Sequence, residues 1–166
     1  MRSERGYSMV ELLITLGLIG VVSAISVPVF MESNARSALW SGSEQIGASI
    51  RSARLKAISQ NTAYRVTFDC PSANELRTLV VTGDKKVDDD KDRCSQTIDG
   101  DSGIVQLPVG VAYDVDDKAT SLEVTGRGIF TANGGGIPLT ITVTHSAATR
   151  TLTVSGTGQI TFTDVQ

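Results

Sequence analysis

The chain has 166 residues, enough for a membrane segment followed by one globular domain. Apolar residues make up 40% of it and charged residues 20%, which excludes a low-complexity chain. The net charge of −3 gives no general attraction for nucleic acid or anionic lipid.

The N-terminal part carries an uncharged run of twenty residues, from Leu12 to Met31. At about 1.5 Å per residue, a helix of this length spans the roughly 30 Å hydrocarbon core of a bilayer. Arg2 and Arg5 precede the run, which favours a cytoplasmic N-terminus. Glu11 stands at the edge of the run, where a carboxylate is costly in lipid and usually marks a function.

Three interpretations of this segment compete. A secretory signal would use the two arginines as its basic region and could be cut after Ala24, but the apolar run continues past that site. A plain signal-anchor would leave Glu11 unexplained. The third interpretation is a prepilin leader, because Arg5-Gly6-Tyr7 followed by Glu11 resembles the prepilin peptidase site. That site has a basic residue, a glycine, an aromatic first mature residue and a glutamate at the fifth mature position.

Pro28 strengthens this resemblance, since it falls at the twenty-second mature position, where pilins commonly carry a helix-kinking proline. The resemblance implies a leader over residues 1–6, cleavage between Gly6 and Tyr7, and N-methylation of the new Tyr7 amine. It also implies that residues 7–31 form a transmembrane and assembly helix. In a filament of such helices, the Glu11 carboxylate of one subunit would neutralise the Tyr7 amine of its neighbour, which would otherwise lie unpaired away from water.

Residues 32–61 continue the helix into water. Apolar residues recur at spacings of seven, four, three and four, which places them on one helical face: Leu39, Ile46, Ile50, Ala53 and Ala57. We expect this face to pack on a β domain. Gly42 and Gly47 weaken the stretch as a helix, and Asn61-Thr62 is a reasonable end.

Beyond residue 61 the apolar period changes to two, which predicts β-strands. Candidate strands cover residues 64–68, 76–82, 109–115, 122–125, 139–143, 152–154 and 160–162. Glycine-rich turns at 134–136 and 156–158 separate some of them, and Gly126-Arg127-Gly128 reads as a further β-turn. The sequence therefore predicts an α+β protein, a long N-terminal helix packed on an antiparallel β-sheet domain over residues 62–166.

Two segments resemble the GspH/FimT group of minor pilins and pseudopilins: residues 52–61 with the strand that follows, and the closing hairpin at 150–160. The resemblance implies a pilin fold and a structural subunit of a type IV pilus or a type II secretion pseudopilus. The subunit would cross the inner membrane once and carry a periplasmic globular domain. Its partners would be other pilins, the prepilin peptidase and the inner-membrane assembly platform. We expect neither enzymatic activity nor a cofactor.

The two cysteines, Cys70 and Cys94, predict one disulfide if the bulk of the chain is exported. Between and beyond them, Asp88, Asp90 and Asp92 have the alternate spacing of a calcium loop, and Asp99 stands at its twelfth position. However, Arg93 occupies the place of the required glycine, and Asp99 is not a bidentate glutamate. A solvated loop is the preferred interpretation, and a calcium site is the weaker one.

A DNA-binding role in natural transformation is the alternative function. Some FimT-like pilins carry a Gly-Arg-x-Arg motif near the C-terminus, whereas the corresponding positions here read Gly158-Gln159-Ile160-Thr161. Residues 107–166 contain three basic and five acidic side chains, which argues against phosphate binding. A third class, a secreted monomeric binding module, requires removal of residues 7–31. The single histidine, His145, reads as a surface or turn residue.

Overall fold

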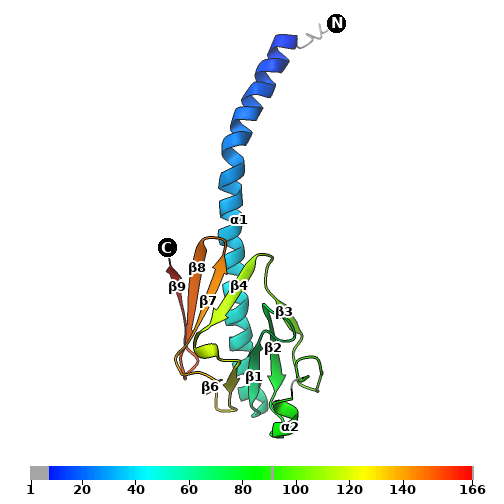
Figure 1. The fold of residues 1–166 in the computed structure, drawn as a ribbon, viewed down its shortest axis with the longest axis vertical. Coiled ribbons are helices and arrows are strands. Elements are labelled where there is room, and N and C mark those ends of the chain that lie inside the picture. Colours follow the sequence, from blue (N-terminus) through cyan, green and yellow to red (C-terminus); the bar gives the residue numbers. More distant parts are fainter. Residues whose placement is uncertain (1–7, 91, 166) are drawn as a thin grey trace. The chain divides into compact units, whose positions relative to one another are not determined.

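The computed structural model describes residues 8–90 and 92–165, and it divides the chain into one unit that ends at Ala35 and another that begins at Arg36. Helix α1 (Met9–Gln60) runs through both units (Figure 1). It ends where the sequence predicts, because Asn61 adopts a left-handed conformation with φ of +50°. The N–H of Thr62 then donates to the carbonyl of Ala57 at 3.1 Å, which satisfies one of the last helical acceptors.

The second unit contains two antiparallel sheets. The five-stranded sheet has the order β3 (Ile104–Gln106), β2 (Glu75–Val80), β1 (Tyr64–Phe68), β5 (Ser121–Val124) and β6 (Phe130–Asn133). The four-stranded sheet has the order β4 (Val111–Val115), β7 (Leu139–His145), β8 (Ala148–Val154) and β9 (Ile160–Val165). A short helix α2 (Lys85–Asp88) follows β2, and a 3₁₀ turn η1 (Asp116–Lys118) follows β4.

The predicted α+β class and the predicted strands are confirmed, with shifted ends. Val109 is one such shift: it lies outside β4 and is 97% exposed. Strands β3 and β6 were not predicted. Strand β3 has three residues, two of them exposed, and β6 buries only Phe130, so neither carries a readable alternation.

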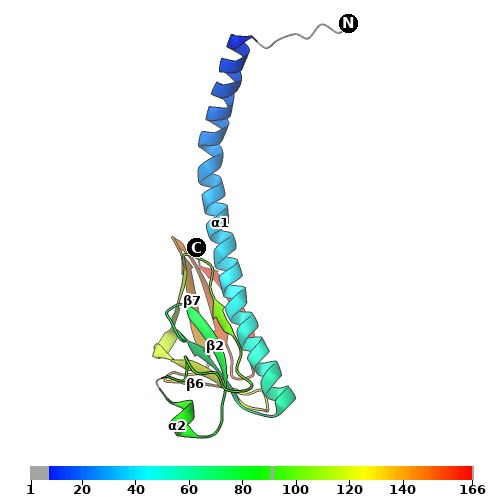
Figure 2. The same cartoon turned by 90° about the vertical axis from the view of Figure 1, so that its right-hand side faces the viewer.

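The core lies between the second half of α1 and the sheets (Figure 2). The predicted helical stripe, from Leu39 to Ala57, is at most 4% exposed and belongs to one cluster with side chains of both sheets.

The two glycines in this part of α1 allow close packing. A Cβ at Gly42 would lie 2.8 Å from Val111 Cγ1 on β4, and one at Gly47 would lie 2.9 Å from Phe162 Cζ on β9. Their absent side chains therefore let two strands approach the helix, a role that helix propensity alone does not reveal.

Candidate functional site

The first candidate site is the apolar half of α1. From Met9 to Met31 the large apolar side chains are 54–80% exposed within the structure. The segment is long and apolar enough to cross a membrane by length and composition. An apolar surface of this extent needs lipid or protein to cover it.

The residues predicted to direct processing and assembly lie at the beginning of this helix. Glu11 is in the first turn of α1, at the edge of the apolar segment, and it has no ion-pair partner within residues 8–90 and 92–165. Gly6 and Tyr7 lie outside the described residues, so the pairing of the Tyr7 amine with Glu11 stays a prediction. Pro28 lies within α1.

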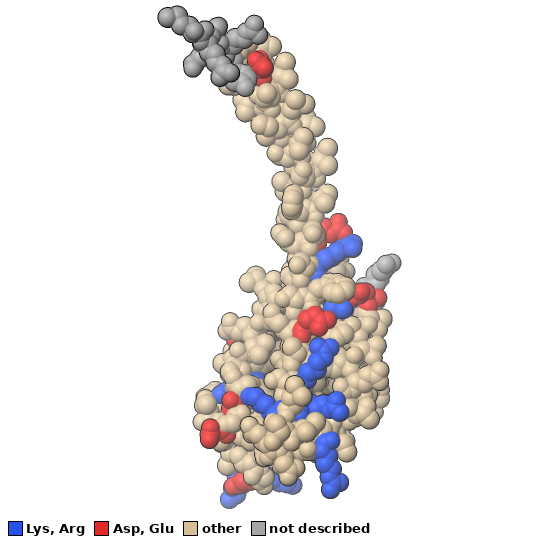
Figure 3. All heavy atoms as spheres, turned by 180° about the vertical axis from the view of Figure 1, so that it is seen from behind, with Lys and Arg blue, Asp and Glu red and all other residues tan. Residues whose placement is uncertain are grey.

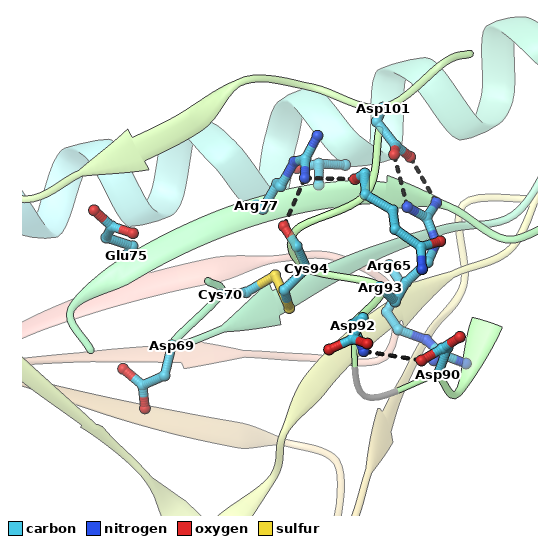
Figure 4. Close-up of a disulfide and its surroundings, with 12 residues drawn as sticks. Arg65, Asp69, Cys70, Glu75, Arg77, Asp90, Asp92, Arg93, Cys94 and Asp101 are labelled. Atoms are coloured by element: carbon cyan, nitrogen blue, oxygen red, sulfur yellow. Dashed lines mark hydrogen bonds and ion pairs between the residues drawn. A yellow bond between two sulfur atoms is a disulfide. The ribbon is translucent and has the colours of Figure 1, made fainter. Parts of the chain in front are cut away.

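The disulfide between Cys70 and Cys94 is confirmed, with the two Cα atoms 5.2 Å apart (Figure 4). It joins the loop between β1 and β2 to the segment that follows α2. The backbone of Cys70 is also tied to the five-stranded sheet, because its N–H donates to the carbonyl of Glu75 at 3.1 Å.

A buried arginine of β2 holds the segment that leads from Cys94 to β3. Arg77 is 6% exposed and donates to the carbonyls of Cys94 and Gln96, both at 2.7 Å. It also donates to the side chain of Thr97 at 2.9 Å and to the carbonyl of Ser102 at 3.2 Å. One guanidinium thus satisfies three backbone carbonyls of this segment. These carbonyls are outside any strand and would otherwise need water as their hydrogen-bond donor.

A second buried arginine, Arg93, follows the acidic run, in which Asp84, Asp89, Asp90 and Asp92 are exposed as the solvated-loop prediction expects. Its side chain is 4% exposed, and it donates to both oxygens of Asp101 at 2.8 Å. Asp101 also accepts from the N–H groups of Val80 and Ile98 at 2.8 and 2.9 Å. Burial by itself would raise the pKa of Asp101, but the hydrogen bonds from Arg93 and from these two N–H groups together lower it below its ordinary value. The loop is solvated at Asp89 and its neighbours, but it is anchored at Arg93.

The four carboxylates of the weak calcium candidate are not gathered at one point. The carboxylate of Asp88 accepts from the N–H groups of Thr82 and Gly83, both at 2.9 Å, and thereby closes the turn before α2. Asp90 accepts from the N–H of Asp92 at 2.9 Å. Across residues 8–90 and 92–165, no group of three or more His, Cys, Asp or Glu side chains is arranged to hold a metal ion.

Sequence reasoning missed the role of Arg150, which reads as an ordinary basic residue of the closing hairpin. Its guanidinium carbon lies 3.9 Å from the ring centroid of Trp40 on α1 and 4.6 Å from that of Phe162 on β9. The side chain donates to Ser43 Oγ at 2.8 Å, and its Nε is 3.0 Å from Asp164. Arg150, a residue of β8, therefore links this strand to α1 and to β9 through side-chain contacts.

The turns read from the sequence have the predicted forms. In the turn after β5, the N–H of Gly128 donates to the carbonyl of Thr125 at 2.8 Å. In the turn after β8, the N–H of Gly158 donates to the carbonyl of Ser155 at 2.9 Å, so the two arginine positions of the motif fall after this turn, at Gln159 and at Thr161 in β9. His145 ends β7, next to the turn into β8, as predicted.

Two family models match this chain, one over its globular part and one over its N-terminal part. A family model described as the type II transport protein GspH matches residues 43–158. A model described as the prokaryotic N-terminal methylation motif matches residues 1–27. No curated protein matches the chain.

Two solved structures are similar in fold. The type IV minor pilin FimU of Pseudomonas aeruginosa is 17% identical with a TM-score of 0.56, covering 79% of this chain and 95% of that one. The minor pseudopilin EpsH from the type 2 secretion system of Vibrio cholerae is 18% identical with a TM-score of 0.50, covering 73% of this chain and 92% of that one. These likenesses confirm the pilin fold.

Proposed function

Because this chain belongs to the family of the type II transport protein GspH, it is a structural minor pilin or pseudopilin subunit, and we propose that Glu11 directs its assembly after cleavage between Gly6 and Tyr7. The observation that carries the proposal is the position of Glu11 at the edge of the exposed apolar half of α1. The match of residues 1–27 to the methylation motif supports N-methylation of the Tyr7 amine. Neither match specifically supports the alternative of a DNA-binding pilin.

The proposed location is the inner membrane, with one span over residues 7–31 and the β domain in the periplasm. The apolar segment and the basic residues before it support this orientation. The proposed partners are the prepilin peptidase, the inner-membrane assembly platform and other pilins. The subunit would leave the bilayer for the filament when its apolar helix packs against the helices of its neighbours.

Glu11 gives this step its specificity. A carboxylate next to an apolar helix is unfavourable in lipid, and the amine of a neighbouring Tyr7 offsets that cost only within the filament. In a medium of low dielectric constant, removing one member of such a pair leaves the other charge uncompensated. The pair therefore favours the assembled state over the subunit that remains in the membrane.

The test compares Glu11→Ala with Glu11→Asp, which keeps the charge on a shorter side chain. Membrane and sheared-filament fractions are quantified, and the intact mass of the membrane form reports cleavage and methylation. We expect Glu11→Ala to insert and to be cleaved normally, because both steps depend on the apolar run and on Gly6. Its filament fraction should fall at least about tenfold, the equivalent of about 1.4 kcal/mol, and Glu11→Asp should retain part of the wild-type level.

Two results would contradict the proposal. Entry of Glu11→Ala into filaments at the wild-type level would exclude the carboxylate as the pairing group. A mature N-terminus at Ile25 would show that a secretory peptidase removes the assembly helix.

A further inference from the structure

Acidic and basic residues are segregated along the part of the chain that forms the second unit. No acidic residue lies between Glu44 and Asp69, and none lies between Glu123 and Asp164. These two stretches include the end of α1 and the turns after β5 and β8. Figure 3 shows Lys and Arg side chains gathered on the lower half of one face of the domain, with few carboxylates between them.

Arg54 of α1 lies between the turns after β5 and β8. A Cβ at either Gly128 or Gly158 would lie 3.1 Å from Arg54 Nε, so the arginine packs closely against both turns. The two glycines have φ values of +77° and +80°, in the left-handed region that favours glycine. The turns are joined by a hydrogen bond from the N–H of Phe130 to the carbonyl of Gly156 at 2.9 Å.

Arg54 has no partner for its charge among the residues that the structure describes. Its Nε is buried without a hydrogen bond, and the side chain forms no ion pair there. A carboxylate from another molecule would pair this charge through the terminal nitrogens of the guanidinium, which can donate two parallel hydrogen bonds.

Exposed apolar side chains lie close to this arginine in the chain, on α1, and in the turn after β5. Leu55, Ile58 and Ile129 are 69%, 49% and 52% exposed, and a Cβ at Gly128 would lie 3.0 Å from Ile58 Cδ1. Arg127, in the same turn, is exposed and has no ion pair among the described residues. Five residues make up this basic–apolar patch: Arg54, Leu55, Ile58, Arg127 and Ile129.

We propose that the basic–apolar patch binds a carboxylate-bearing surface on the globular domain of a neighbouring pilin-type subunit. This inference rests on the proposed function, since it names a second contact used in assembly. An apolar centre with a charged rim is the usual anatomy of a protein interface. This chain itself exposes the carboxylates of Asp84 and Asp90 on either side of α2, beside Lys85 and Lys86, so a subunit of this class can offer a carboxylate to such a patch.

The composition of the patch favours a protein partner over nucleic acid. A single-stranded nucleic acid site stacks bases on aromatic rings along a groove of several cations. The patch instead offers two unpaired arginines and three branched aliphatic side chains. The net charge of −3 gives no long-range attraction for phosphate.

The experiment uses the full chain, expressed with the companion pilin-type subunits of its own machine. A photo-crosslinking amino acid replaces Leu55 in the patch, or Val109, which is 97% exposed and lies outside it. In sheared filaments, we expect the crosslinker at position 55 to yield an adduct with another pilin-type subunit. The adduct should map to a segment that carries carboxylates, and position 109 should not give it.

Charge reversal tests the role of the arginines. The variant Arg54→Glu/Arg127→Glu should reduce both the adduct and the filament fraction at least about tenfold, while its membrane level stays that of the wild type. Arg127→Glu alone changes an exposed side chain, and it should lower both in the same direction with an unchanged thermal midpoint. The control variant Lys118→Glu reverses an exposed charge outside both the patch and the acidic residues around α2, and it should assemble normally.

Three outcomes would overturn the inference. Normal adduct and incorporation in Arg54→Glu/Arg127→Glu would exclude the patch as an assembly contact and leave the proposed function standing. Loss of duplex DNA binding in that variant, with normal incorporation, would assign the patch to nucleic acid. Failure of the wild-type chain to enter filaments at all would overturn the proposed function together with this inference.

Discussion

Replacing Gly42 by alanine tests how closely α1 packs against β4. Helix propensity alone predicts that the change stabilises the protein by about 1 kcal/mol, because alanine is the better helix former. The structure predicts the opposite sign. The new Cβ would lie 2.8 Å from Val111 Cγ1, 3.5 Å from Pro108 Cδ and 3.6 Å from Val111 Cβ.

The cost depends on whether Val111 can move. Its side chain is β-branched and the residue is 4% exposed, so no free rotamer takes the methyl group away from the helix. Overpacking of this kind costs about 1–3 kcal/mol, which exceeds the gain in propensity. We therefore expect a net destabilisation of about 1–2 kcal/mol and a melting temperature lower by about 3–10 °C.

Gly47→Ala should be milder, although its Cβ would lie 2.9 Å from Phe162 Cζ. That atom is the far end of a ring that is only partly buried, and the ring can tilt away. The comparison of the two glycines therefore separates a fixed neighbour from an adjustable one.

The assay is urea unfolding of a fragment that begins at Arg36 and retains the disulfide. The matched control is Val111→Ala, which removes the methyl groups that the new Cβ at position 42 would meet. In that background, Gly42→Ala should no longer destabilise and should show the favourable sign of helix propensity. A stabilisation of about 1 kcal/mol in the wild-type background would refute the close approach of α1 and β4.

Three further predictions concern interactions that stabilise the domain: the disulfide, the Arg93–Asp101 ion pair and the contacts of Arg150. Replacing Cys70 and Cys94 by alanine should lower the free energy of unfolding by about 3 kcal/mol, the chain-entropy estimate for a loop of this size, and reductant should have the same effect on the wild type in a urea titration. Asp101→Asn should cost about 3 kcal/mol because it leaves Arg93 buried without its countercharge. Since the folded-state pKa of Asp101 is lowered, its contribution to stability is complete above about pH 4 and is lost as the pH falls through the folded value, so the variant should lose less stability than the wild type in acid. Arg150→Lys should destabilise by about 1–2 kcal/mol in the same titration, because an ammonium cannot stack flat between two rings.

The sequence by itself determined the parts of this protein that depend on local order. The apolar run from Leu12 to Met31 and the arrangement around Gly6 and Glu11 are contiguous in the chain, and so are the residues that mark the end of α1. The buried face of α1 follows from its period of about 3.6 residues. The longer strands of the domain follow from a period of two, as in 139–143. These patterns identify the pilin class before any contact is known.

Only the tertiary structure decided how the elements meet. The division into two sheets depends on pairing between segments that are distant in the chain. Strand β3 has only three residues, too few to show an alternation of apolar and polar side chains. The buried states of Arg93 and Arg150 depend on partners supplied by other elements, Asp101 in one case and Trp40 with Phe162 in the other. The energy of a buried charge is set by the groups around it rather than by its neighbours in sequence, so both arginines read as surface residues until the fold placed their partners beside them.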